Sequence, residues 1–94
     1  MIVNYRDKRT WAFAEDGFVR EFETFRQQAE KRLTILEAAM ALEDLRALPS
    51  NRLEALQGKR RGQWSIRINL QWRICFEWSQ GAPGPSNVEI VDYH

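Results

Sequence analysis

The apolar positions of the chain change their spacing about two thirds of the way along. From Phe18 to Met40 they recur at steps of three and four, which places side chains on one face of a helix. From Gln63 to Trp78 apolar and polar residues alternate, which is the period of a strand with one buried face. The order of these patterns predicts an α+β fold, in which helices pack on one face of a small antiparallel sheet.

The first half of the chain predicts a strand and then helices. The β-branched stretch Ile2–Tyr5 is expected to form an opening strand, and Asp7 can cap a helix that ends at Gly17. The later helical pattern is longer than a small domain is wide, so we expect a break near residues 27–29 that gives an αα-hairpin. Residues 43–48 are expected to add one more turn. The buried side of this region should hold Phe18, Phe22, Phe25, Ala29, Leu33, Leu36 and Met40.

The second half predicts an antiparallel meander. Residues 63–68 and 72–78 read as a hairpin closed by residues 69–71, and residues 87–93 read as the last strand. Their alternation puts Arg67, Arg73 and Tyr93 on the side of the sheet away from the helices. The core side is expected to carry Trp64, Ile66, Ile68, Trp72, Ile74, Phe76, Trp78, Val88 and Ile90.

Charge is concentrated in one segment. The whole chain has a formal net charge of +1, but residues 51–73 carry six basic residues and one acidic residue, a net charge of +5. Such a segment favours an anionic partner, of which nucleic acid is the commonest. Besides Arg52, the basic residues are Lys59, Arg60 and Arg61 in a loop between two glycines, and Arg67 and Arg73 in the strands. A solvated basic turn, and strand arginines paired with acids such as Glu77 or Glu89, are the alternatives.

Length and composition exclude several classes of protein. The 94 residues suffice for one domain, residues 1–94, and no stretch is long and apolar enough to cross a membrane. The opening residues lack the apolar region of a secretory signal, so a cytoplasmic location is expected. Cys75 is the only cysteine and is interpreted as a structural thiol. With a single histidine, no zinc-ligand spacing exists, and neither a metal nor another cofactor is expected.

The chain closes with Asp92-Tyr93-His94, a group that could transfer protons. Cleaving RNA without a metal requires a base for the ribose 2′-OH, cations for the charge on phosphorus, and an acid for the leaving 5′-oxygen. His94 and Tyr93, together with Arg73 and Arg67, could supply these parts if the last strand lies beside the hairpin. The alternative is that His94 is a frayed terminal residue.

Several strings of residues resemble one toxin family over nearly the whole chain. These are Asn51-Arg52-Leu53-Glu54-Ala55-Leu56, GKRRGQWSIRIN from Gly58, QWRICFEW from Gln71, and the closing VEIVDYH. The sequence is similar to the HigB-type toxins, the "plasmid maintenance system killer" branch of the RelE/ParE superfamily.

This resemblance implies a RelE-like α+β fold with a curved sheet, and a ribosome-dependent endoribonuclease that cuts mRNA. It implies a HigA-like helix-turn-helix antitoxin as partner, which contacts operator DNA. The catalytic residues implied are Arg73, Asp92, Tyr93 and His94, and Lys59, Arg60 and Arg61 would hold RNA phosphates, beside Arg67 on the sheet.

Two other functions remain open for this fold. Some members of the group carry a histidine in the loop before the basic cluster, where Glu54 and Gln57 are the nearest polar residues of this chain. The superfamily also includes toxins that bind and inhibit DNA gyrase without catalysis. Beside the nuclease, the two alternatives are therefore a gyrase-binding toxin and a weakened toxin that mainly binds its antitoxin.

Overall fold

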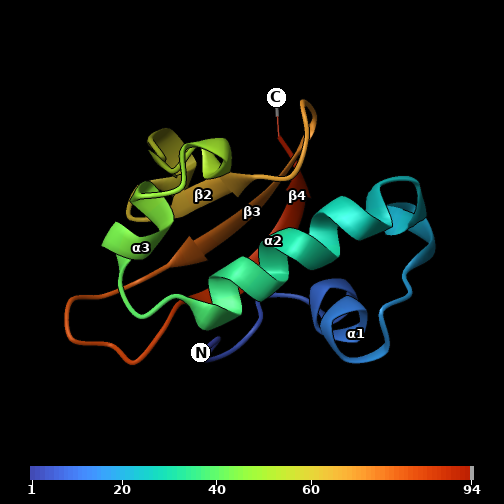
Figure 1. Cartoon of the computed structure of the whole chain (residues 1–94), viewed down its shortest axis with the longest axis horizontal. Coiled ribbons are helices and arrows are strands. Elements are labelled where there is room, and N and C mark those ends of the chain that lie inside the picture. Colours follow the sequence, from blue (N-terminus) through green and yellow to red (C-terminus); the bar gives the residue numbers. More distant parts are fainter. Residues whose placement is uncertain (94) are drawn as a thin grey trace.

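A computed structural model describes residues 1–93 of the chain and confirms the α+β class (Figure 1). Three α-helices come first and a four-stranded antiparallel sheet follows, with its strands in the order β1-β2-β3-β4. Short 3₁₀ helices, labelled η, lie between these elements. The elements are α1 Lys8–Asp16, η1 Arg20–Phe25, α2 Arg26–Ala38, α3 Leu42–Arg46, η2 Pro49–Asn51, β1 Glu54–Ala55, η3 Gly58–Arg60, β2 Trp64–Arg67, β3 Trp72–Glu77 and β4 Ser86–Asp92.

Helix α1 begins and ends where the sequence predicted. The side chain of Asp7 accepts a hydrogen bond from the backbone N–H of Thr10, which satisfies one of the free donors of the first turn. Gly17 adopts φ = 74°, and its N–H donates to the carbonyl of Phe13. A residue with a Cβ is strained in this left-handed conformation, so the glycine ends the helix.

The break predicted near residues 27–29 is wrong. Helix α2 runs through these residues, and the change comes at Phe25, where the 3₁₀ helix η1 gives way to α2. A 3₁₀ helix has three residues per turn, so Phe22 and Phe25 fall on the same side of η1, and both are buried. No glycine or proline lies between residues 26 and 38 to interrupt the longer helix.

The opening strand is also a correction. Residues 2–5 form no strand; Tyr5 makes one parallel bridge to Val88, and Arg6 N–H donates to the carbonyl of Val88. The paired segment stays short because Asp7, two residues after Tyr5, already caps helix α1. Two positions expected in the core are exposed, Phe18 by 58% and Met40 by 84%, since each lies outside the helix whose face it was assigned to.

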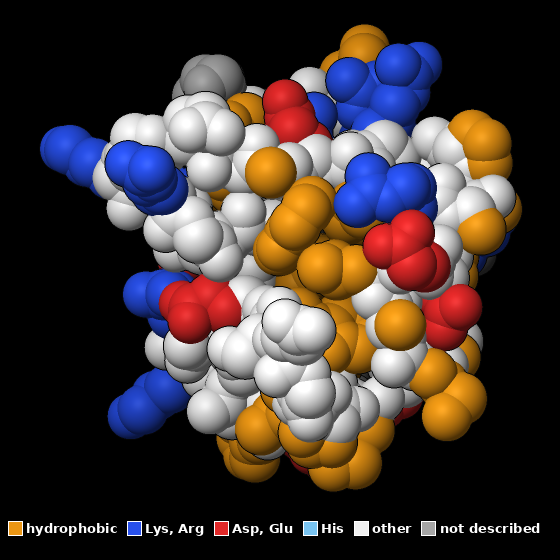
Figure 2. All heavy atoms as spheres, turned by 90° about the vertical axis from the view of Figure 1, so that its left-hand side faces the viewer, with side chains coloured by type: hydrophobic (Ala, Val, Ile, Leu, Met, Phe, Trp, Pro, Cys, Tyr) orange, Lys and Arg blue, Asp and Glu red, His pale blue; other side chains and the backbone are white. Residues whose placement is uncertain are grey.

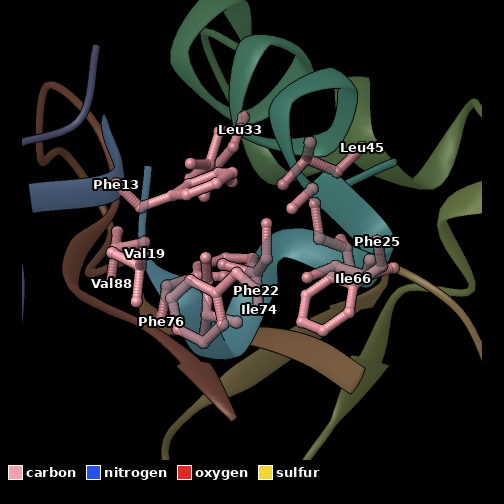
Figure 3. Close-up of a cluster of buried hydrophobic side chains, with 14 of the residues drawn as sticks. Phe13, Val19, Phe22, Phe25, Leu33, Leu45, Ile66, Ile74, Phe76 and Val88 are labelled. Carbon is pink, nitrogen blue, oxygen red and sulfur yellow. The ribbon is translucent and has the colours of Figure 1, made fainter. Parts of the chain in front are cut away.

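The core lies between the helices and one face of the sheet, as predicted. Figure 3 shows Phe22 beside Ile74 and Phe76, with Leu33 and Leu45 of the helices on the other side of the cluster. Trp72 stacks on Phe25 with ring centroids 4.8 Å apart and meets Phe22 edge-on at 5.7 Å. Trp64, Trp72 and Trp78 are half-buried against this core, so packing explains their positions on the strands.

Strand β1 is an element that the sequence did not predict. Its two residues, Glu54 and Ala55, pair with Ser65 and Trp64 of β2. The chain reaches this position through Asn51, which is fully buried. The amide of Asn51 donates to the carbonyl of Leu45 and accepts from Arg32 at 2.7 Å, which connects α2, α3 and the start of the sheet.

Candidate functional site

The face of the sheet away from the helices gathers the polar and charged residues of the strands. We call it the outer face. Strand register places Arg67 directly opposite Arg73, and Ser65 opposite both Glu54 and Cys75. On the other side, Arg73 pairs with Val91, and Cys75 pairs with Glu89. The outer face comprises Glu54, Ser65, Arg67, Arg73, Cys75, Glu77, Glu89, Val91 and Tyr93.

The side chain of Arg73 is fixed on this face by several contacts. Its side chain is only 14% exposed, and its Nη1 donates to Ser65 Oγ at 2.7 Å. The same nitrogen lies 3.2 Å from Glu54 Oε1, and the guanidinium carbon lies 5.1 Å from the centre of the Tyr93 ring. Contacts from β1, from β2 and from the residue that follows β4 therefore fix the orientation of the guanidinium group, which presents several donors to one ligand.

Arg67 brings a second positive charge next to the first. Like charges at directly opposed strand positions destabilise a sheet. Among residues 1–93, no acidic side chain forms an ion pair with Arg67, and its buried Nε lacks a hydrogen-bond partner. A buried donor without a partner costs about 1–3 kcal/mol. An anion held between the two guanidinium groups would offset both costs.

The structure brings Tyr93 to this site but separates Asp92 from it. Tyr93 packs in a small cluster with Leu56, Cys75 and Val91, next to Arg73. Asp92 precedes Tyr93, and successive residues of a strand point to opposite faces. It lies opposite Trp72 and accepts a hydrogen bond from Gln71 Nε2 at 2.9 Å. Figure 1 shows the end of β4 beside the β2–β3 turn. His94 lies outside the described residues.

The basic loop of residues 57–63 borders the outer face, and its charged residues differ in their surroundings. Lys59 and Arg61 are exposed and form no ion pair with any residue from 1 to 93. Arg60 is partly buried, with Nη1 3.2 Å from Glu89 Oε1 and 3.0 Å from Gln63 Oε1. The three residues that the sequence grouped together thus have two kinds of environment.

Cys75 is buried under these charges and is not a nucleophile in this state. The pKa of its thiol is raised to about 11, chiefly by burial; Arg60 and Arg73 oppose this rise, and Glu89 adds to it. A neutral buried thiol is unreactive, as the sequence predicted.

The described part of the chain offers no metal centre and no membrane-crossing helix. Within residues 1–93, no three His, Cys, Asp or Glu side chains lie close enough together to hold a metal ion. None of the helices found in the same residues is long and apolar enough to span a bilayer.

Comparison with known proteins decides the family. A family profile described as the RelE-like toxin of the type II toxin-antitoxin system HigB matches residues 3–94. The chain belongs to the HigB-like toxin family. It is therefore a toxin of a type II toxin–antitoxin system and has an antitoxin as partner.

Individual relatives of this HigB-like toxin include one that is similar over most of its length. Toxin HigB-1 of Vibrio cholerae is 37% identical over 83 residues, which are 86% of this chain and 87% of that protein. An uncharacterized protein of Haemophilus influenzae is 35% identical over 48 residues, 51% of this chain and 48% of that one. Among solved structures, the YoeB/ParE toxin from Agrobacterium tumefaciens covers 99% of this chain and 97% of its own, with 16% identity and a TM-score of 0.47.

Sequence reasoning missed one residue of the site in this HigB-like toxin. Glu54 contacts Arg73, whereas the sequence indicates only that it is a polar residue near the basic loop. Strand β1 is too short to show an alternating pattern, so its pairing with β2 had no signal. A useful hint is that Glu54 is the single acidic residue within the basic segment 51–73.

Proposed function

We propose that this HigB-like toxin is a ribosome-dependent endoribonuclease that cuts mRNA by attack of a ribose 2′-OH on the adjacent phosphate. The observation that carries the proposal is the directly opposed pair Arg67 and Arg73, with a buried guanidinium nitrogen that lacks a partner among the described residues. A phosphodiester presents two oxygens to planar guanidinium donors, which suits such a pair.

The neighbouring side chains suggest how the proton transfers would run. Glu54 is half exposed beside Arg73, so its carboxylate can take the proton from the 2′-OH. The 2′-oxygen then bonds to phosphorus, the bond to the 5′-oxygen breaks, and the products are a 2′,3′-cyclic phosphate and a 5′-OH. Tyr93, together with His94, is proposed to give the leaving 5′-oxygen its proton. Asp92, held by Gln71, would fix the end of β4.

Contacts away from the scissile phosphate are assigned to the basic loop. The loop that carries Lys59, Arg60 and Arg61 is proposed to hold phosphates of mRNA or ribosomal RNA as a unit, since clustered Lys and Arg bind a polyanion without reading its sequence. The antitoxin is proposed to be a HigA-like helix-turn-helix protein. Operator DNA would then be contacted only through that antitoxin.

Mapping the 5′ ends of cellular RNA after brief induction of the chain tests the proposed function. We expect new 5′-OH ends in translated messages. We expect Arg73→Gln to abolish both these ends and the growth arrest, because the phosphate loses the hydrogen-bond donor whose orientation is fixed. The matched control is Arg26→Gln on α2, which removes an arginine that pairs with Glu23 and Glu30 away from the outer face. Binding of the antitoxin to both variants reports that they fold.

A DNA supercoiling assay separates the alternative. Inhibition of gyrase by the purified chain, with no new RNA ends, would overturn the nuclease proposal and favour a gyrase-binding toxin. Full toxicity of the Arg73→Gln variant at equal expression would remove the phosphate-binding role from Arg73.

A further inference from the structure

Glu89 connects two segments that lie far apart in the chain. It projects from β4, is 18% exposed, and directs Oε1 toward Arg60 Nη1 at 3.2 Å and Arg6 Nε at 3.6 Å. Arg6 belongs to the N-terminal segment and also reaches Glu77 at 3.1 Å. A single carboxylate of the outer face therefore pairs with both the basic loop and the N-terminal segment.

The basic loop has few other attachments near its tip. Gly58 and Gly62 take φ values of 63° and 92°, and an added Cβ at either would meet no atom within 4 Å. Leu56 is buried at one end of the loop, and β2 begins at the other. Between these ends, Arg60 reaches the sheet through Glu89 of β4, and it also contacts Gln63 within the loop.

We propose that Glu89 is a positioning residue, which holds the loop through Arg60 so that Lys59 and Arg61 face the RNA phosphates. This rests on the proposed function and divides the three basic residues of the loop into a tether and two contacts. Arg60 forms an ion pair with Glu89, whereas Lys59 and Arg61 are exposed with no ion pair to the described residues. An ordered loop binds a polyanion more tightly because less conformational entropy is lost on binding.

Amide hydrogen exchange of the free toxin tests the tether without any RNA. We expect Glu89→Gln and Arg60→Gln each to raise exchange of residues 58–63 about tenfold, because a charge-assisted hydrogen bond is lost. The matched control is Glu77→Gln on β3. It removes an ion pair of similar length on the same face of the sheet but leaves the contacts of Arg60 in place. Unchanged exchange in both tether variants, with the fold intact by circular dichroism, would overturn the proposal.

Binding of a single-stranded RNA oligonucleotide at several salt concentrations tests the division of roles. Removing one phosphate contact lowers the slope of log K against log salt by about 0.7 for a single strand. We expect this loss for Lys59→Gln and Arg61→Gln. For Arg60→Gln and Glu89→Gln we expect weaker binding with the slope kept, and a double variant no weaker than either single one. A lowered slope for Arg60→Gln, with additive effects, would make Arg60 a direct contact and overturn the proposal.

Cleavage on translating ribosomes gives the readout that a merely structural role would not give. We expect Glu89→Gln to raise KM for the ribosome several-fold while kcat stays near that of the wild type, because the reacting groups remain in place. A fall in kcat with unchanged KM would contradict positioning of the loop. If the wild type neither binds nor cuts RNA, the proposed function fails, while the exchange experiment still decides whether Glu89 holds the loop.

Discussion

At the scale of single residues, the outer face of the sheet is defined by which charges have partners. Arg73 is held by Ser65 and Glu54, whereas Arg67 has a buried nitrogen without a partner in the described chain. The alternation of the strands predicted that both arginines lie on this face. It could not predict their surroundings, because Glu54 comes from a strand of two residues and pairs eleven positions away with Ser65.

Replacing Glu54 by glutamine separates proton transfer from phosphate binding. Glutamine keeps the shape of the side chain but cannot take the proton of the 2′-OH. We expect single-turnover cleavage on ribosomes to slow by about 10²–10⁴-fold, the usual contribution of a general base, with ribosome binding retained. If cleavage by Glu54→Gln were as fast as by the wild type, the carboxylate would only neutralise Arg73.

Cys75 makes the stability of the toxin depend on pH in the alkaline range. Burial raises the pKa of the folded thiol from near 9 to about 11, so the folded state binds this proton more tightly than the unfolded state. The contribution is complete below pH 9 and is lost as the pH rises toward 11, by at most about 2–3 kcal/mol.

Urea unfolding between pH 8 and pH 11 measures this contribution of Cys75. We expect the free energy of unfolding to fall more steeply with pH for the wild type than for Cys75→Ala. Tyr5, whose pKa is also raised by burial and by Glu37 and Glu15, is present in both proteins, so the difference isolates Cys75. Parallel curves would show that the thiol is not linked to folding.

At the scale of the elements, the sequence predicted regular segments well and short ones poorly. Helix α1 has its own cap and stop, and β2, β3 and β4 have clear alternation, so local patterns suffice for them. The 3₁₀ helix η1 and strand β1 depend on contacts with distant parts of the chain. Phe22 packs on Trp72, and Glu54 on β2, and no local pattern encodes such contacts.

Asn51 tests how strongly the short elements depend on one side chain. Its buried amide is the link between α2, α3 and the start of the sheet, and an alanine would leave the carbonyl of Leu45 and the guanidinium of Arg32 without this partner. We expect Asn51→Ala to lower the free energy of unfolding by about 2 kcal/mol in urea. The control is Gln28→Ala, at an exposed amide side chain on α2. Equal losses in the two variants would contradict the special role of Asn51.

At the scale of the whole molecule, packing and charge occupy opposite sides of one sheet. The helices and the core lie on one side (Figures 1 and 3), and the arginines lie on the other. At the α3 end, Figure 2 shows hydrophobic side chains in the centre, with Lys and Arg side chains around them. The sequence predicted this two-sided arrangement from the period of the strands. It could not place Glu54 beside Arg73, because β1 is too short to show an alternating pattern.

The opposed arginines also give the toxin a sensitivity to dissolved ions. Two guanidinium groups that repel each other weaken the folded state until a multivalent anion lies between them, and a ligand that binds only the folded state raises its melting temperature. We expect sulfate to raise the melting temperature by a few degrees over chloride at equal ionic strength, and expect most of this gain to vanish in Arg67→Gln. An equal gain in both proteins would show a general salt effect. The melting temperature would then report whether an anion occupies the outer face, without any ribosome in the assay.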